Sequence, residues 1–177
     1  MSIATFLQHL GIMNALSIEI ERTRREYTEL AVGVAQIDST IEHARAHRAE
    51  VAFDLGEHTT KILRAYDWVG QVDDESVLII MPGFRRCLDE RVAELRNRLQ
   101  SFVDGAYSGE SWAVSLGMAW FDGVVSSRDT LLRAAMEALE RAKEHPSHVA
   151  TAPEIQVEEL LSAHFKSGRL AHRRARS

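Results

Sequence analysis

The sequence contains little cysteine and no excess of positive charge. Its 177 residues include one cysteine, Cys87, so one chain can build neither a disulfide framework nor a site of several thiolate ligands. The formal net charge of -5 creates no basic field of the kind that attracts nucleic acid. We therefore expect a protein of the reducing cytoplasm whose partners do not include DNA or RNA.

Long apolar runs are also absent. No stretch approaches the roughly 18 consecutive apolar residues that a helix needs to cross a bilayer. The N-terminus lacks the basic region and apolar stretch of a secretory signal, so we expect no membrane segment. The 45% of hydrophobic and 27% of charged residues are ordinary for a globular protein with one packed core.

Hydrophobic periodicity predicts alternating helices and strands. Apolar residues at helical spacing predict helices over residues 15–29, 41–65, 88–103 and 127–145. Short runs rich in branched side chains predict strands over residues 30–37, 67–72, 76–81 and 112–120. Ser126 and Asp129 are spaced as in a capping box that opens the last helix, and Pro146 ends that helix.

The strands over residues 67–72 and 76–81 are separated by a short acidic turn, which predicts a β-hairpin. The element order is then α-β-α-β-β-α-β-α, with helices long enough to cross over a sheet. This order predicts an α/β sandwich of the α+β type, with a central mixed sheet of about five strands, a central hairpin and flanking helices.

The chain divides into a domain over residues 1–150 and a C-terminal segment over residues 151–177. Apolar residues between positions 157 and 165 suggest a short amphipathic helix in this segment, and a basic tail follows. The basic tail could contact acidic partners or anionic surfaces, or it could be a solvated terminus.

The predicted order resembles that of the GGDEF domain of diguanylate cyclases, which join two GTP molecules into cyclic di-GMP. RAYDWVGQVDDESV at residues 64–77 is similar to the family's R-x-x-D motif followed at a fixed distance by G-G-D-E-F. Pro82 falls where the family has a proline after the second hairpin strand. Further similar segments are GIMN at residues 11–14, AVSLGMA at 113–119 and LLRAAMEALERAK at 131–143. The resemblance covers about residues 9–150 and implies the nucleotidyl-cyclase-like fold of this family.

The resemblance implies catalysis by a divalent metal held on carboxylates, but this chain departs from that pattern. Gln36 stands at the position of a metal-binding aspartate in the first strand, although Asp38 matches a second acid nearby. A neutral amide is a poor ligand for Mg²⁺. The signature itself is degenerate, because acids replace the two glycines and serine replaces the glutamate: it reads Asp73, Asp74, Glu75, Ser76 and Val77. We expect no complete metal site, no catalytic residue, no requirement for Mg²⁺ or another cofactor, and no cyclase activity.

The R-x-x-D motif survives as Arg64 and Asp67, and in the family it is the inhibitory site that binds the product. A guanidinium can donate to O6 and N7 of guanine and stack on a base, and a carboxylate can accept from N1 and N2. Family members often add an arginine from the next helix or from a partner subunit, and Arg91 and Arg96 are the candidates. The alternative is an ordinary Arg–Asp pair at a helix end. A second R-x-x-D at residues 86–89 matches no family position, so the prediction depends on register with the hairpin.

Three functions are compatible with the resemblance. The first is a catalytically inactive GGDEF-like domain that acts as a receptor for cyclic di-GMP through the R-x-x-D site, as a homodimer or with a protein partner. The alternative is a nucleotide-independent dimerisation or interaction module that regulates another cyclic di-GMP signalling protein. Residual GTP turnover is the third and least favoured reading.

Residues 161–170 resemble the linker that joins GGDEF domains to EAL phosphodiesterase domains, so the chain could belong to a longer protein.

Overall fold

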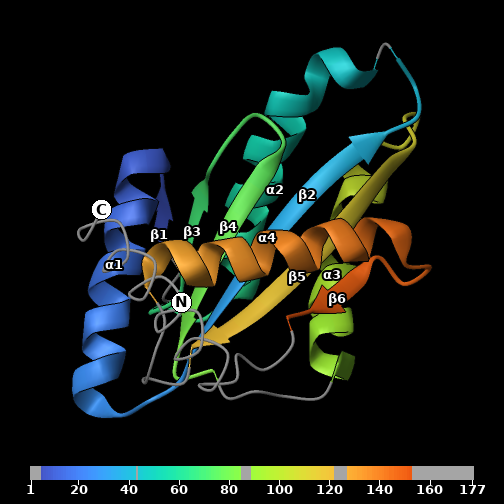
Figure 1. The fold of residues 1–177 in the computed structure, drawn as a ribbon. Helices are drawn as coiled ribbons and strands as arrows, with labels where there is room; N and C mark the ends of the chain where they lie inside the picture. The colour runs from blue at the N-terminus through green and yellow to red at the C-terminus, as the bar shows by residue number, and fades with distance from the viewer. Residues whose placement is uncertain (1–4, 43, 85–88, 122–126, 153–177) are drawn as a thin grey trace, which may run out of the picture.

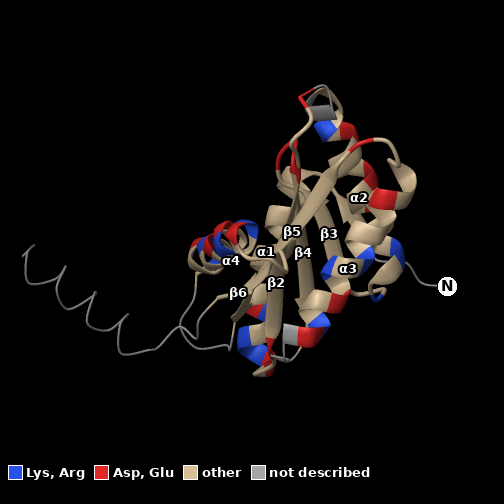
Figure 2. Cartoon of the chain, turned by 90° about the vertical axis from the view of Figure 1, so that its right-hand side faces the viewer, with Lys and Arg blue, Asp and Glu red and all other residues tan. Residues whose placement is uncertain are grey.

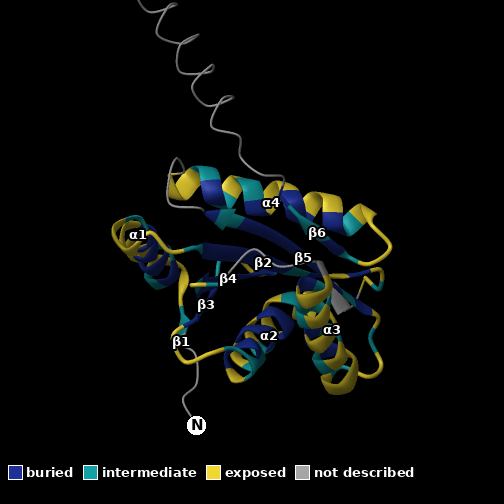
Figure 3. Cartoon of the chain, turned by 90° about the horizontal axis from the view of Figure 1, so that it is seen from below, coloured by how far each residue is buried: buried dark blue, intermediate teal, exposed yellow. Residues whose placement is uncertain are grey.

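One mixed β-sheet forms the centre of the molecule and helices cover both of its faces. The computed structural model describes residues 5–42, 44–84, 89–121 and 127–152. Viewed along the sheet, α1 (His9–Glu26) and α4 (Arg128–Glu144) lie on one face, and α2 (Arg48–Ile62) and α3 (Asp89–Ala106) lie on the other (Figure 3). Among the described helices, none is long and apolar enough to span a membrane.

The sheet has six strands in the order β1-β3-β4-β2-β5-β6 (Figure 1). The strands are β1 (Thr5–Leu7), β2 (Leu30–Ser39), β3 (Trp68–Gln71), β4 (Ser76–Pro82), β5 (Trp112–Phe121) and β6 (Val149–Thr151). The long strand β2 lies in the centre and pairs antiparallel with both β4 and β5. The edge strands β1 and β6 pair parallel with β3 and β5. The predicted α+β sandwich with a mixed sheet is confirmed.

The predicted hairpin is confirmed as well. Strands β3 and β4 pair antiparallel, with Trp68 opposite Ile80 and Gln71 opposite Val77. The turn between the two strands contains the three acids at residues 73–75. The R-x-x-D motif at residues 64–67 therefore stands directly before the hairpin, in the register that the sequence predicts.

Other boundaries differ from the prediction. The sheet has six strands and not about five, because β1 and β6 contain only three residues each and are too short for a detectable alternation. The helix predicted over residues 41–65 is a short 3-10 helix, Ala44–His47, followed by α2, which ends at Ile62. The predicted α4 cap is shifted: Ser127 is the N-cap, and its hydroxyl accepts from the Thr130 backbone N–H at 3.2 Å. Ser126 and residues 153–177 of the predicted C-terminal segment (151–177) lie outside the described residues.

The core forms two layers because the side chains of β2 and β4 alternate between the faces of the sheet. Ala31, Ala35, Val77 and Ile79 belong to the layer packed under α2 and α3. Neighbouring residues of the same strands, including Val32, Val34, Leu78 and Ile80, belong to the layer packed under α1 and α4. Every one of these eight side chains is fully buried, so both helical layers are anchored on the same pair of strands.

Gly117 in β5 allows α4 to approach the sheet closely. A Cβ atom at this position would lie 2.2 Å from the Leu139 backbone nitrogen and 2.5 Å from the Ala135 carbonyl oxygen. Those atoms belong to the helix backbone and cannot move independently. The glycine is therefore required by packing and not by its φ angle.

Gly117→Ala is expected to lower the free energy of unfolding by about 3 kcal/mol, because the new methyl group must displace α4 from β5. Gly105→Ala, in the exposed part of α3 where a Cβ meets nothing within 4 Å, is the matched control. It is expected to be neutral or to stabilise the helix by up to about 1 kcal/mol. Urea unfolding followed by circular dichroism measures both, and equal stabilities of the two variants would contradict this account of the packing.

Candidate functional site

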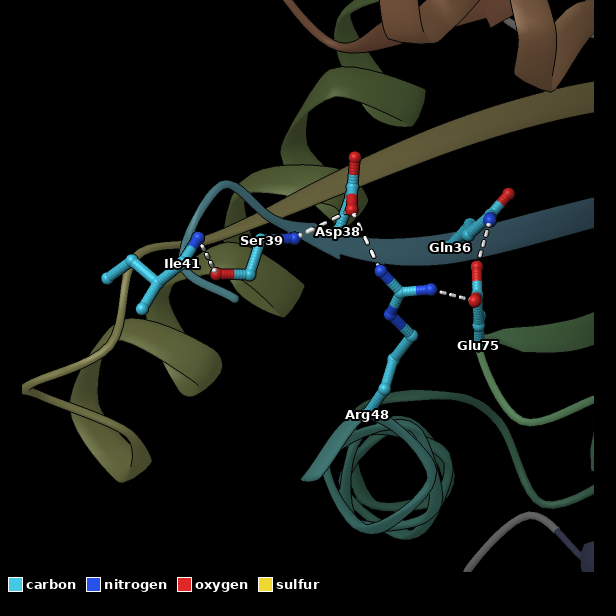
Figure 4. Close-up of polar contacts among 6 residues, drawn as sticks. All are labelled: Gln36, Asp38, Ser39, Ile41, Arg48 and Glu75. Atoms are coloured by element: carbon cyan, nitrogen blue, oxygen red, sulfur yellow. Dashed lines mark hydrogen bonds and ion pairs between the residues drawn. The ribbon is translucent and has the colours of Figure 1, made fainter. Parts of the chain in front are cut away.

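Polar side chains from three elements meet where β2 ends beside the hairpin turn (Figure 4). Gln36 and Asp38 lie in β2, Glu75 lies in the turn before β4, and Arg48 is the first residue of α2. The backbone brings them together: Gln36 is paired with Ser76 across the sheet, and the Ile37 N–H donates to the Glu75 carbonyl oxygen at 3.1 Å. Gln36 then donates from Nε2 to Oε2 of Glu75 at 2.8 Å.

The Arg48 guanidinium lies between the two carboxylates of this cluster (Figure 4). Its Nη1 donates to Oε1 of Glu75, and its Nη2 lies 3.3 Å from Oδ1 of Asp38. The Arg48 side chain is 20% exposed and that of Glu75 is 34% exposed, so the contact is shielded from water on most sides. A cation supplied by the chain itself therefore neutralises these acids.

The residues of this cluster do not fit a divalent metal ion. Mg²⁺ requires oxygen ligands in a nearly octahedral arrangement at about 2.0–2.1 Å. Both oxygens of Glu75 already accept hydrogen bonds, and the Gln36 amide presents its N–H to Glu75. A metal ion near Glu75 would also face the positive charge of Arg48. Nowhere among the described residues do three or more His, Cys, Asp or Glu side chains gather as metal ligands would.

The other residues of the 73–77 segment, which resembles the family signature, are divided between solvent and core. Asp73 and Asp74 are exposed, and acidic segments mark the turns at this end of the molecule in Figure 2. Oδ1 of Asp73 accepts from the Glu75 backbone N–H at 2.8 Å, a contact that shapes the turn. Ser76 and Val77 are buried in β4. Residues 73 and 74, where the resemblance implies glycines, thus carry charged side chains that are exposed to solvent.

The R-x-x-D motif forms a turn at the end of α2. The Asp67 carboxylate is 3% exposed, and its Oδ2 accepts from the Arg64 backbone N–H at 2.9 Å. The Asp67 N–H in turn donates to the Arg64 carbonyl oxygen at 3.0 Å. Oδ1 of Asp67 is buried without a hydrogen-bond partner among the described residues. Asp67 therefore fixes the backbone of Arg64 and does not face solvent.

The Arg64 guanidinium is exposed and rests on aromatic rings. Its Cζ lies 5.7 Å from the ring centroids of both Tyr66 and Phe84, and its Nη1 donates to the Tyr66 hydroxyl at 3.0 Å. A cation held over aromatic faces is stabilised without losing its outward hydrogen-bonding edge. Arg64 lies two residues past the end of α2, and not in its last turn as the sequence predicts.

A pocket of about 240 Å³ adjoins Arg64 between the end of α2, the end of β4 and the first half of α3. Three arginines line it, Arg64, Arg91 and Arg98, together with Glu94. Its remaining lining is apolar and comprises Ile62, Leu63, Met81, Phe84, Val92, Leu95 and Met118. The structure therefore places Arg64 and Arg91 in the lining of one pocket.

Arg96 does not line this pocket, and Arg98 does. The guanidinium of Arg96 donates from Nε to the Val114 carbonyl oxygen at 2.8 Å and from Nη2 to Gln100 at 3.0 Å, so it ties α3 to β5. Burial lowers the pKa of Arg96 from its ordinary value. Sequence reasoning missed Arg98, although its spacing of seven residues from Arg91 places both on one face of a helix.

The two regions lie at opposite ends of β4, since Glu75 precedes this strand and Phe84 follows it. Seven residues at about 3.3 Å each separate them by roughly 23 Å. The pocket beside Arg64 and the cluster around Arg48 are therefore separate sites.

Among the comparisons with known proteins, only the comparison with solved structures found similar proteins. The sequence matches no family model and no curated protein. The structure is similar to the GGDEF domain of DgcB from Caulobacter crescentus in complex with c-di-GMP, with a TM-score of 0.68 and 14% identity over 85% of this chain and 91% of that one. It is also similar to the active GGEEF domain of a diguanylate cyclase from Vibrio cholerae, with a TM-score of 0.69 and 14% identity over 85% of this chain and 99% of that one.

A third similar structure is a microbial GGDEF domain described in a novel interaction mode with bis-(3,5)-cyclic di-GMP. It has a TM-score of 0.63 and 25% identity over 82% of this chain and 90% of that one. The molecule therefore has the GGDEF domain fold, an α+β arrangement in which four helices cover an open, mixed six-stranded sheet. The fold predicted from the sequence is confirmed.

The buried carboxyl group of Asp67 predicts a pH dependence. Burial raises its pKa above the usual value of 3.8, opposed in part by the Arg64 backbone hydrogen bond and charge. The folded protein then takes up this proton at a higher pH than the unfolded chain does, so this contribution to stability falls as pH rises through that window. As pH is lowered from 7 toward 4, wild type should gain stability relative to Asp67→Asn, by at most about 1.4 kcal/mol per pH unit.

Urea unfolding of both proteins across this pH range measures the difference. The exposed Asp129→Asn is the matched control and should track wild type. A difference between wild type and Asp67→Asn that stays constant with pH would contradict the assignment.

Proposed function

We propose that this chain is a catalytically inactive GGDEF-like domain that binds cyclic di-GMP beside Arg64 and acts as a receptor. The observation that carries the proposal is the pocket in which Arg64, Arg91 and Arg98 surround an apolar floor. It lies at the R-x-x-D motif, which in the GGDEF family binds this nucleotide. Two structures with the same fold are described with cyclic di-GMP, which supports the choice of ligand.

The chemistry of the pocket suits this ligand. A guanidinium donates to both O6 and N7 of guanine, and its flat face stacks on the base. The lining carries three positive charges and one negative charge, on Glu94, whereas cyclic di-GMP carries two negative phosphodiester groups. Glu94 is paired with Arg98 at 2.5 Å, which leaves Arg64 and Arg91 as the principal contacts for phosphate or base.

A pocket of about 240 Å³ is smaller than the roughly 300–1,000 Å³ of sites that enclose a whole ligand. It therefore receives one part of the nucleotide, such as a guanine, and the remainder lies along the surface or against a second subunit. Such an arrangement would link ligand binding to dimerisation or to contact with a protein partner.

Asp67 acts as a positioning residue in this proposal. Its Oδ2 accepts a hydrogen bond from the Arg64 N–H, and its Oδ1 is buried, so direct contact of the carboxylate with guanine would require this buried group to become exposed. Arg64, on the other hand, is exposed and already oriented by the rings of Tyr66 and Phe84. We therefore assign the direct contact to Arg64 and its orientation to Asp67.

Residues at the other end of β4 support the proposal that the chain has no cyclase activity. Arg48 lies where a metal ion would have to approach Glu75 and Asp38, and Gln36 binds Glu75 through its amide. Asp73 and Asp74 place two negative charges where the family brings backbone close to a triphosphate. Two unit charges at 4 Å repel by about 1 kcal/mol in water and by several times that near a protein surface. No Mg²⁺ or other cofactor is required for the proposed function.

The alternative function is a nucleotide-independent interaction module. One observation favours it: Leu10 and Ile18, two turns apart on α1, are both largely exposed among the described residues. Apolar side chains at helical spacing are typical of a surface that packs on another helix. This reading predicts no response to the nucleotide, so the experiment below separates it from the receptor.

Calorimetry with cyclic di-GMP tests the receptor directly. Wild type is expected to bind, and Arg64→Ala to bind at least about tenfold more weakly because it loses the stacking and bidentate contact. Arg91→Ala should also weaken binding. Arg133→Ala, an exposed arginine on the opposite face of the sheet, is the control and should bind like wild type. No heat with wild type, or equal affinity in Arg64→Ala, would refute the receptor.

An assay for product formation tests the absence of catalysis. Incubation with GTP and Mg²⁺ or Mn²⁺ is expected to yield no cyclic di-GMP, from wild type or from Arg48→Ala, because Gln36 and Ser76 still lack carboxylates. An active cyclase verifies the assay. Turnover that persists through repurification of wild type and disappears in Glu75→Ala would show that the cluster supports catalysis after all.

A further inference from the structure

A second pocket lies at the C-terminal half of α1, and Tyr66 is the one residue that it shares with the surroundings of Arg64 described above. Its volume is about 370 Å³. It lies between the end of α1 with the residues that follow it, the segment before β3, and the end of β4. The lining comprises Glu19, Arg22, Thr23, Glu26, Thr28, Tyr66, Pro82 and Gly83. α1 covers the opposite face of the sheet from α2 and α3, so this pocket is distinct from the one beside Arg64 and Arg91 (Figure 3).

The unusual feature of this pocket is a buried carboxylate. Glu19 is only 4% exposed, at a position of α1 whose buried neighbours Leu16 and Ile20 are apolar. Charged residues are seldom buried to this degree without a partner. Its Oε1 accepts from the Trp68 indole N–H at 3.2 Å and lies 3.9 Å from Nη1 of Arg22. Its Oε2 has no hydrogen-bond partner among the described residues.

The surroundings of Glu19 favour a positively charged ligand. Arg22 is the one basic residue in the lining, and its Nε is bound to Glu26 at 3.1 Å. The two carboxylates of Glu19 and Glu26 and the single guanidinium of Arg22 give the lining of the pocket a net negative charge. The exposed Tyr66 ring, which also contacts the Arg64 guanidinium, adds an aromatic surface that attracts cations. The hydroxyl groups of Thr23 and Thr28 can accept hydrogen bonds.

We propose that this pocket binds a single guanidinium or protonated amine, with Glu19 as its principal acceptor and Tyr66 against its face. Oε2 of Glu19 is out of contact with solvent in the free protein. The last torsion of a glutamate side chain is broad, so a small rotation turns Oε2 toward the pocket and gives it the donor that it lacks. A charged donor is the best partner for such an oxygen, because hydrogen bonds between ions are stronger than neutral ones.

The inference goes beyond the proposed receptor function and does not depend on it. The experiment uses the full chain without any nucleotide, so its result is independent of binding beside Arg64. Tryptophan fluorescence is a suitable readout, since the Trp68 indole is hydrogen-bonded to Glu19. The probe is methylguanidinium, and methylurea is its neutral counterpart of nearly the same shape.

Wild type is expected to give a saturable fluorescence change with methylguanidinium, with a dissociation constant on the order of 1 mM for so small a group. Methylurea should give none. Glu19→Gln keeps the size of the side chain and removes its charge, and it should weaken binding at least about tenfold. Glu21→Gln is the matched control on the same helix: Glu21 is paired with Arg24 outside the pocket, so this variant should behave like wild type.

Three results would overturn the proposal: no saturable change in wild type, an equal response to methylurea, or unchanged affinity in Glu19→Gln. If Glu19→Gln fails to fold, the exposed Glu26→Gln serves the same purpose, and unchanged affinity there would count against the site. Agmatine and N-acetyl-arginine amide, which both carry a guanidinium, then separate a small free ligand from an arginine side chain of a protein partner. Glu19-dependent binding of either supports the site, and binding of neither contradicts it.

Discussion

The antiparallel pairing of β2 with β4 is the constraint on which both polar regions depend. Its register sets Gln36 opposite Ser76 at one end and Leu30 opposite Pro82 at the other. A slip by one residue would turn every buried side chain of β4 to the wrong face of the sheet. It would also carry Glu75 away from Arg48. Burial of the strand pair therefore fixes the polar cluster and the arginine-lined pocket at the same time.

A guanidinium among carboxylates differs physically from a metal ion at the same place. Arg48 is attached to α2, directs planar N–H donors at Glu75 and Asp38, and cannot dissociate. A bound metal offers empty coordination positions to a substrate and polarises the oxygens that it touches. Arg48 can neutralise charge and hold the hairpin turn in place, but it has no vacant position for a phosphate oxygen or a hydroxyl nucleophile.

The sequence predicts what is local and misses what depends on distant pairing. The hairpin is signalled by two adjacent strand patterns and an acidic turn, whereas β1 and β6 exist as strands only through their neighbours β3 and β5. Arg64 and Arg91 can be identified in the sequence as candidate ligand-binding residues, from their residue type and from their position relative to the hairpin. Arg48 was not predicted, because its contact with Glu75 spans 27 residues. The sequence likewise did not predict that Glu19 is buried, although its charged side chain, between Leu16 and Ile20, interrupts the apolar face of α1.

The turn formed by Arg64 and Asp67 has a consequence for the entropy of the ligand binding proposed at Arg64. Asp67 holds the Arg64 backbone with a buried hydrogen bond, and two aromatic rings restrict its guanidinium. Ordering a free loop and a long side chain usually opposes binding, by about 0.5–1.5 kcal/mol for each such side chain. Here most of that ordering has already taken place on folding, because the buried carboxylate of Asp67 maintains the turn. The domain thus exchanges some stability for preorganisation of one arginine.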